Sequence, residues 1–284
     1  TNSFVEPLTY GKTAGVSTVA LLVSATFWAW IWGPMGLLLS VPLTVVLAVL
    51  GKHVPQFEPL GILLGDEPAL PPHASFYQRL LAGDADEAAA LLDEQVASAG
   101  RAVAYDRLIL PALALAERDS HQGDLDQSDR DFVWQNAGDL LEENAPPPAD
   151  GERRVLVAGC AAEDLADELA LVMLRQIAPP DCEVTIASAD LMASEKIAAM
   201  ARHAPHAVII SAVGPGGDLH VRYLCKRIRH EFPRLRIIAA RWGYLGDRER
   251  LAAGLKQRGA DSLVTTLEEA LDLINRIHPM PMSA

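Results

Sequence analysis

The 284-residue sequence has few cysteines, few basic residues and few aromatic residues (6%). Three cysteines cannot form a disulfide framework, which excludes the small cystine-stabilised domains. Only 24 Lys and Arg stand against 37 Asp and Glu, and the pI is 5.0. Because neutralising phosphates requires clustered Lys and Arg, we expect no nucleic-acid partner. Hydrophobic residues make up 50% of the chain, which excludes intrinsic disorder.

Charge is also missing locally, since 39 consecutive residues between Lys12 and Lys52 include no Asp, Glu, Lys or Arg. A helix that spans a membrane needs about 20 apolar residues. Here Gly33-Pro34-Met35-Gly36 divides the run into pieces at residues 16–32 and 36–50. Two arrangements fit, a helical hairpin that turns at this break or one crossing followed by a broken or re-entrant piece. The run therefore predicts a lipid bilayer as a partner.

Glycine and proline within such a run free backbone groups that lipid cannot satisfy, and in transporters they often mark the substrate path. The transport-path candidates of this kind are Gly33, Pro34, Gly36 and Pro42. The alternative is an ordinary turn packed in lipid. Glu6 is the only acid before residue 58, and a carboxylate beside a membrane helix often marks an ion or proton path. The alternative for Glu6 is an interfacial residue in a surface turn.

The same segment resembles the autoinducer-2 exporter family. The residues that carry the resemblance follow one another in order: Asn2-Ser3-Phe4-Val5-Glu6-Pro7, Tyr10-Gly11-Lys12, Trp32-Gly33-Pro34 and Val41-Pro42-Leu43-Thr44. The resemblance covers residues 1–53. It implies a multi-pass inner-membrane transporter for a small organic solute, with most of the membrane domain upstream. It adds Asn2, Glu6, Pro7 and Gly11 to the transport-path candidates, with Asn2 either bonding the solute or capping a turn.

Several features predict where the rest of the chain lies. Lys52 and His53 follow the apolar run, and positive charge beside a membrane segment favours the cytoplasmic side. All three cysteines lie beyond residue 159, which suits a reducing compartment. We therefore expect residues 55–284 to be cytoplasmic, and we expect a homo-oligomer. Because position 1 is Thr, we interpret the chain as processed or as the C-terminal part of a longer protein.

Two segments of different pattern follow the apolar run. Residues 55–73 are rich in proline and predict a linker. Residues 74–145 repeat apolar side chains at steps of three and four, which predicts four amphipathic helices in a small bundle. Residues 146–152 include three consecutive prolines and predict a second linker.

Residues 153–279 alternate short apolar runs with helical patterns. The five expected strands lie at residues 154–159, 183–187, 207–211, 235–239 and 262–264. Continuous apolar runs are typical of parallel strands that are buried on both faces. The fold class predicted for the whole chain is therefore a membrane α-helical hairpin, a four-helix bundle and a flavodoxin-like α/β domain with a five-stranded parallel sheet. Ligands of such sheets bind beyond the carboxyl ends of the strands.

A helical bundle followed by an α/β domain is similar to the cobalamin-binding module, here over residues 75–277. Residues 81–88, 110–113 and 123–125 resemble its helical cap. That module carries an Asp-x-His-x-x-Gly loop after its first strand, and Glu163, Leu165 and Glu168 stand at those positions. Because the Leu165 side chain has no lone pair to donate to cobalt, we expect the fold without the cobalamin cofactor.

The same resemblance supplies candidates for a ligand pocket: Glu163, Ser211, Gly214, Gly216, Gly217, Trp242 and Gly243. Trp242 would fill space that the nucleotide tail of cobalamin needs. The glycine-rich stretch at 214–217 could cradle a phosphate before a helix, or it could form a turn with Asp218 as the helix cap. The histidines do not lie at metal-ligand spacing, so we expect no metal. No catalytic triad or carboxylate pair is recognisable, so we expect no enzyme.

Two functions follow from these patterns. The first is part of a transporter with a cytosolic accessory or regulatory domain. The second is a membrane-tethered sensor of a small, cobalamin-like ligand, without transport activity. A cobalamin-dependent enzyme half is disfavoured, because the ligand histidine is absent.

Overall fold

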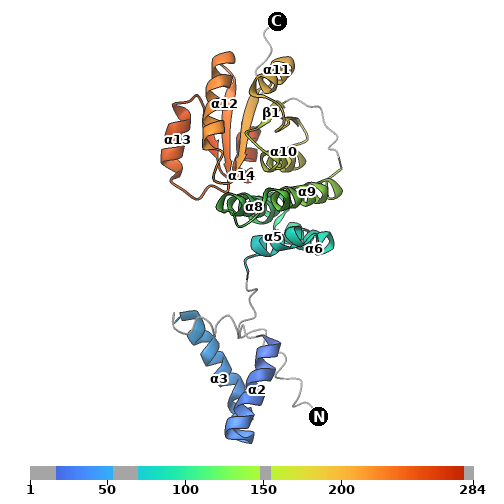
Figure 1. Ribbon diagram of the computed structural model, residues 1–284, viewed down its shortest axis with the longest axis vertical. Coiled ribbons are helices and arrows are strands. Elements are labelled where there is room, and N and C mark those ends of the chain that lie inside the picture. The colour runs from blue at the N-terminus through green and yellow to red at the C-terminus, as the bar shows by residue number, and fades with distance from the viewer. Residues whose placement is uncertain (1–16, 54–69, 148–154, 278–284) are drawn as a thin grey trace. The chain divides into compact units, whose positions relative to one another are not determined.

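The computed structural model describes residues 17–53, 70–147 and 155–277 (Figure 1). The chain divides into two compact units, residues 1–71 and 72–284.

The first unit contains two helices, α2 (Thr18–Trp32) and α3 (Pro34–His53). Ser17 caps α2 by accepting a hydrogen bond from the Ala20 amide, and α2 ends at Gly33, whose φ is 62°. The two helices approach closely beside this break. A β-carbon on Gly36 would lie only 1.9 Å from the Trp28 carbonyl oxygen, so the absence of a side chain allows the contact.

The predicted membrane hairpin is wrong. Within residues 17–53, 70–147 and 155–277, no helix is both long enough and apolar enough to cross a membrane. The break at Gly33 ends α2 after 15 residues. At 1.5 Å per residue this helix is about 22 Å long, against about 30 Å of hydrocarbon. The 20 residues of α3 end in Lys52 and His53 and include Pro42.

The second unit begins with helices that pack on one another. They are α5 (Pro72–Ala82), α6 (Ala85–Ala99), α7 (Arg101–Ala104), the π-helical η2 (Tyr105–Ile109), α8 (Leu110–Gln122) and α9 (Gln127–Glu143). The segments α7, η2 and α8 follow one another without a break. Pro111 lacks an amide hydrogen, and the wider η2 turn just before it lets the helix continue.

The α/β part of this unit contains five parallel strands in the order β2-β1-β3-β4-β5, so the predicted five-stranded parallel sheet is present. The strands are β1 (Val155–Ala161), β2 (Cys182–Ala187), β3 (Ala207–Val213), β4 (Arg236–Trp242) and β5 (Ser262–Val264). The helices are α10 (Leu165–Ile177), α11 (Ala193–His203), α12 (Asp218–Glu231), α13 (Arg248–Lys256) and α14 (Leu267–Asn275).

Two hydrophobic clusters lie on the two faces of the sheet. The cluster on one face joins the sheet to α10, α14 and the helices α5 to α9, which Figure 1 shows together on that side. The cluster on the other face joins it to α11, α12 and α13. The bundle and the sheet therefore share one core, and α8 reaches the carboxyl end of β3.

Candidate functional site

The carboxyl ends of β1, β3 and β4 form the edge at which sequence analysis places a ligand pocket. Side chains of α8 lie directly against the glycine-rich loop that follows β3. A β-carbon on Gly214 would lie 2.7 Å from the Glu117 Cγ, and one on Gly216 would lie 3.1 Å from the His121 Nε2. Gly214 also has a φ of 73°. Glycine is required at position 214 for both reasons, and the protein's own α8 occupies the space beside this loop.

Asp167 lies at the centre of this edge and is only 1% exposed. Its Oδ1 accepts a hydrogen bond from the Val213 amide (2.6 Å), and its Oδ2 accepts one from the Glu163 amide (2.9 Å). Burial and, after it, the charge of the neighbouring Asp164 raise the pKa of Asp167 to about 8, although the backbone amides that it accepts act in the opposite direction. The Asp167 carboxyl therefore ties the loop after β1 to the end of β3.

Ser211 and Trp242 form a second buried link. The Ser211 hydroxyl donates to the Asp167 carbonyl oxygen (2.7 Å) and accepts from the Trp242 indole Nε1 (2.7 Å). Both side chains are almost completely buried. The two predicted pocket residues are thus brought together, but they bond to the protein itself.

Arg241, the penultimate residue of β4, is a buried cation with 2% of its surface exposed. Its Nη2 donates to the Gly214 carbonyl oxygen (2.8 Å), and its Nε lies 2.9 Å from the Asp218 Oδ1. A β-carbon on Gly217 would lie 2.8 Å from the Arg241 Nη1. The guanidinium group therefore packs beneath the glycine-rich loop and holds it from below.

Charged groups of the bundle complete the edge. The Glu117 Oε1 lies 2.9 Å from the His121 Nε2, and its Oε2 lies 3.7 Å from the Arg130 Nη1. The Arg130 guanidinium carbon lies 4.3 Å from the centre of the Trp134 ring. Burial raises the pKa of Asp164 to about 6, and the Glu117 charge contributes in the same direction. The negative charges of Glu117 and Asp164 thus lie near the positive charge of Arg130, and these groups connect the bundle with the start of α10.

The remaining predicted pocket residues lie at the rim. The Glu163 carboxylate pairs with the His220 Nδ1 at 2.9 Å, and both side chains are about half exposed. Gly243 has a φ of 65°, and its amide donates to the Thr265 carbonyl oxygen. Leu165 is the first residue of α10, directly after its N-cap Asp164. In the described ranges, no group of three or more His, Cys, Asp or Glu side chains is arranged to hold a metal ion.

Three central residues of this edge were not predicted from the sequence: Glu117, Asp167 and Arg241. Each is a charged side chain with at least one neighbour far away in sequence, namely Gly214 for Glu117, Val213 for Asp167 and Gly214 for Arg241. The only local signal was the spacing of Asp164 and Asp167, which is typical of a helix N-cap and first turn.

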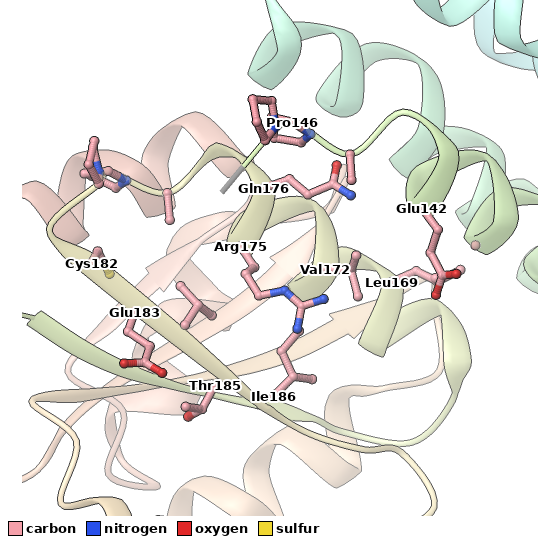
Figure 2. A pocket seen from close by; sticks show the side chains of 17 residues that line it. Glu142, Pro146, Leu169, Val172, Arg175, Gln176, Cys182, Glu183, Thr185 and Ile186 are labelled. Atoms are coloured by element: carbon pink, nitrogen blue, oxygen red, sulfur yellow. The ribbon is translucent and has the colours of Figure 1, made fainter. Parts of the chain in front are cut away.

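A groove of about 870 Å³ lies elsewhere, between α9, α10 and the edge strand β2 (Figure 2). Its walls include Leu169, Val172 and Ile186, and the Arg175 side chain crosses it from α10. None of the predicted pocket residues lines this groove.

In the first unit, the structure places Gly33, Pro34 and Gly36 together at the junction of α2 and α3, with Pro42 inside α3. The Ser40 and Thr44 hydroxyls on either side of Pro42 bond to the Leu37 and Ser40 carbonyl oxygens of their own helix. The other transport-path candidates lie outside the described residues: Asn2, Glu6, Pro7 and Gly11.

Comparison with known proteins supports both resemblances. Residues 1–56 match the AI-2E family transporter model. The AI-2 transport protein TqsA of Escherichia coli is 36% identical over 64 residues, which are 22% of this chain and 19% of TqsA. YhhT of Escherichia coli, named as a transport protein, is 40% identical over 63 residues, 22% of this chain and 18% of YhhT. The match therefore spans about a fifth of the length of these curated relatives.

A solved structure shows a further likeness, in fold. The match to the solved structure of the monomethylamine corrinoid protein from Methanosarcina barkeri covers 72% of this chain and 97% of the corrinoid protein's chain. Its TM-score is 0.52 and its sequence identity is 13%. At this identity the likeness concerns the fold alone. The predicted resemblances to the exporter family and to the cobalamin-binding module are both confirmed.

Proposed function

We propose that this chain carries part of the transport unit of a small-organic-solute transporter and, in residues 72–277, an accessory domain that regulates it. The observation that carries the proposal is the match of residues 1–56 to the AI-2E transporter family. An inner-membrane location with residues 55–284 on the cytoplasmic side is supported by Cys160, Cys182 and Cys225, which are all free thiols.

Flux in membrane vesicles tests transport directly. The protein that contains this chain is expressed, and uptake and efflux of small organic solutes are measured, beginning with AI-2, the solute in the name of TqsA. We expect flux above that of vesicles without the protein, and we expect Glu6→Gln to reduce it while Lys12→Gln serves as the matched control. Flux equal to that of empty vesicles for every solute would favour a sensor without transport.

Regulation requires that a ligand or partner bind two states of the transporter with different affinity. Deletion of residues 72–284 tests this part separately. We expect basal flux to remain and its response to cell extract or added small molecules to disappear. Identical flux and identical response with and without the domain would contradict a regulatory role.

The alternative function, a cobalamin-like sensor, is favoured by the corrinoid-protein fold of the second unit. We propose that the domain binds no cobalamin, and three features support this. Leu165 offers no lone pair at the ligand position, Trp242 is buried against Ser211, and Glu117 lies against Gly214. Purified protein incubated with hydroxocobalamin and then desalted should be colourless. Retained absorbance in the visible range, at one equivalent per chain, would reverse this conclusion.

A further inference from the structure

Charge is distributed very unevenly within the second unit. Residues 207–260 include eleven Lys or Arg and four Asp or Glu, a net charge of +7 in a chain whose net charge is −13. Residues 72–144 include five Lys or Arg and fifteen Asp or Glu, a net charge of −10. The two segments belong to one compact unit. The acidic segment shares a hydrophobic cluster with β3 and β4, whereas α12 and α13 belong to the cluster on the other face of the sheet. The unit therefore has a strongly acidic part and a strongly basic part.

The basic part is an exposed surface on α12 and α13, which lie side by side on the face of the sheet opposite α10 and α14 (Figure 1). We call this surface the basic face. Its members are exposed residues of these helices and of the segment just after α13: Leu219, Tyr223, Lys226, Arg227, Arg250, Lys256 and Arg258. The four on α12 follow one another at steps of three and four and share one side of that helix. The exposed acids Glu231 and Glu249 lie on the same two helices. Two members of the basic face are apolar or aromatic, Leu219 with 74% and Tyr223 with 50% of its surface exposed. In the part of the chain that the structure describes, none of its five cations forms an ion pair.

Other basic residues nearby are already engaged. The Arg229 guanidinium bonds to Asp261 and to backbone oxygens, and Arg248 forms two bonds with the Glu269 carboxylate. Arg241 is buried against Asp218. The five cations of the basic face are not held in this way, and the Arg227 Nη1 donates only to the Tyr223 hydroxyl of the same face.

The bundle carries a matching surface, the acidic corner, at the turn between α5 and α6 and the first turns of α9. Its members are Leu81, Asp84, Asp86, Asp129 and Phe132. Phe132 lies against the turn, since a β-carbon on Gly83 would be 3.3 Å from its ring, and it remains 43% exposed. Asp129 lies three residues before Phe132 on the same side of α9. An exposed apolar pair is again flanked by charge, now of the opposite sign.

We infer that the partner of the basic face is the acidic corner of a second copy of this chain. Each surface combines exposed apolar side chains with charged groups, as protein interfaces do, and the two surfaces are complementary in sign. Because the two surfaces differ, the contact is heterologous, so each copy uses its basic face for one neighbour and its acidic corner for the other. Copies that join in this way form a closed ring or an open chain, depending on the angle between neighbours.

Sedimentation velocity of the 284-residue chain in a mild non-ionic detergent tests the inference. We expect association at 50 mM NaCl that weakens about ten-fold or more at 500 mM NaCl, because the screening length falls from about 14 Å to about 4 Å. The charge reversals Lys226→Glu with Arg227→Glu, and separately Asp86→Lys with Asp129→Lys, should each give monomers. Reversal of Glu268 and Asp272 to Lys on α14, an exposed acidic pair outside both surfaces, is the control and should leave association unchanged.

Mixing the two reversed variants is the decisive step. In the first variant the reversed basic face is negative, and in the second variant the reversed acidic corner is positive, so these two surfaces attract each other. The unaltered acidic corner of the first variant and the unaltered basic face of the second also remain complementary. The mixture should therefore associate as the parent does. Circular dichroism melting curves verify that each variant is folded. Monomers at every salt concentration would overturn the inference, and so would a mixture of folded variants that stays monomeric. Binding of monomers to vesicles with phosphatidylglycerol, lost in the Lys226 and Arg227 variant, would instead identify anionic lipid as the partner.

Discussion

Asp167 shows how one side chain controls the carboxyl edge of the sheet. Its carboxyl group is buried, accepts two backbone amides and has a pKa raised to about 8 by burial and by Asp164. Since this pKa is above that of the unfolded chain, the folded protein binds more protons than the unfolded chain over the range between them. The stability from the neutral carboxyl is fully present below about pH 4 and is lost as the pH rises through 8.

Asp167→Asn distinguishes the contribution of the hydrogen bonds that Asp167 accepts from the contribution of its titration. The Asn amide nitrogen cannot accept a hydrogen bond, so one of the two backbone amides loses its partner, at a cost of about 1–3 kcal/mol near pH 5. Because Asn does not titrate, the difference in unfolding free energy from the parent should shrink between pH 5 and pH 8.5. Urea denaturation of both proteins at a series of pH values measures this. A difference that stays constant over the range would mean that Asp167 titrates normally.

The bond between Ser211 and Trp242 predicts a non-additive pair of substitutions. Ser211→Ala leaves the buried Trp242 indole Nε1 without its acceptor, at a cost of about 1–3 kcal/mol. Trp242→Phe removes the donor and some packing. Once the tryptophan is gone, Ser211→Ala should cost clearly less, with a coupling of about 0.5–3 kcal/mol in a double-mutant cycle. Denaturation of the four proteins measures the cycle, and additive effects would show that the bond adds no stability.

At the scale of elements, the contact of α2 with α3 depends on Gly36. A β-carbon there would lie 1.9 Å from the Trp28 carbonyl oxygen, so Gly36→Leu should force the helices apart. Ala20 and Ala48 are buried in one small cluster of these helices, and cysteines placed there report their separation. We expect disulfide formation in an Ala20→Cys, Ala48→Cys, Cys182→Ala protein to slow several-fold when Gly36→Leu is added. Leu38→Phe, at a position 75% exposed, is the matched control.

At this scale it is also clearest which features of the protein can be predicted from its sequence. The five strands were predictable because parallel strands buried on both faces are continuous apolar runs. The end of β4 was not, because Arg241 interrupts such a run, yet it is buried through its partners Asp218 and Gly214. The same limit hid Glu117, whose contact with Gly214 joins residues almost a hundred positions apart. The helix break at Gly33 was predicted, but the membrane hairpin was not found, because no helix in the described residues is both long enough and apolar enough to cross a membrane.

At the scale of the second unit, the bundle and the sheet are joined by more than the shared cluster. Asp106 in η2 accepts hydrogen bonds from the amides of Leu267 and Glu268 at the start of α14. Tyr105 donates to the Gln176 side chain, and Gln176 donates to the Leu141 carbonyl oxygen. These bonds connect residues of η2 and α9 with α10 and α14. The bundle has no separate core, because one hydrophobic cluster includes both the bundle and one face of the sheet.

Residues 72–277 should therefore unfold in one cooperative transition. Trp134 lies in the bundle and Trp242 in the sheet, so two variants that each retain only one of the five tryptophans report the two parts separately. Because the parts share their core, the two fluorescence transitions in urea should coincide in midpoint and slope. Leu141 is fully buried in α9, so Leu141→Ala should lower the free energy of unfolding by about 2–5 kcal/mol and shift both midpoints together. If the Trp134 signal alone shifted, the bundle would be an independent domain, and a regulatory signal would have to cross a boundary between two domains. A joint shift means that a ligand bound on either part changes the stability of both, as an accessory domain that acts on a transporter requires.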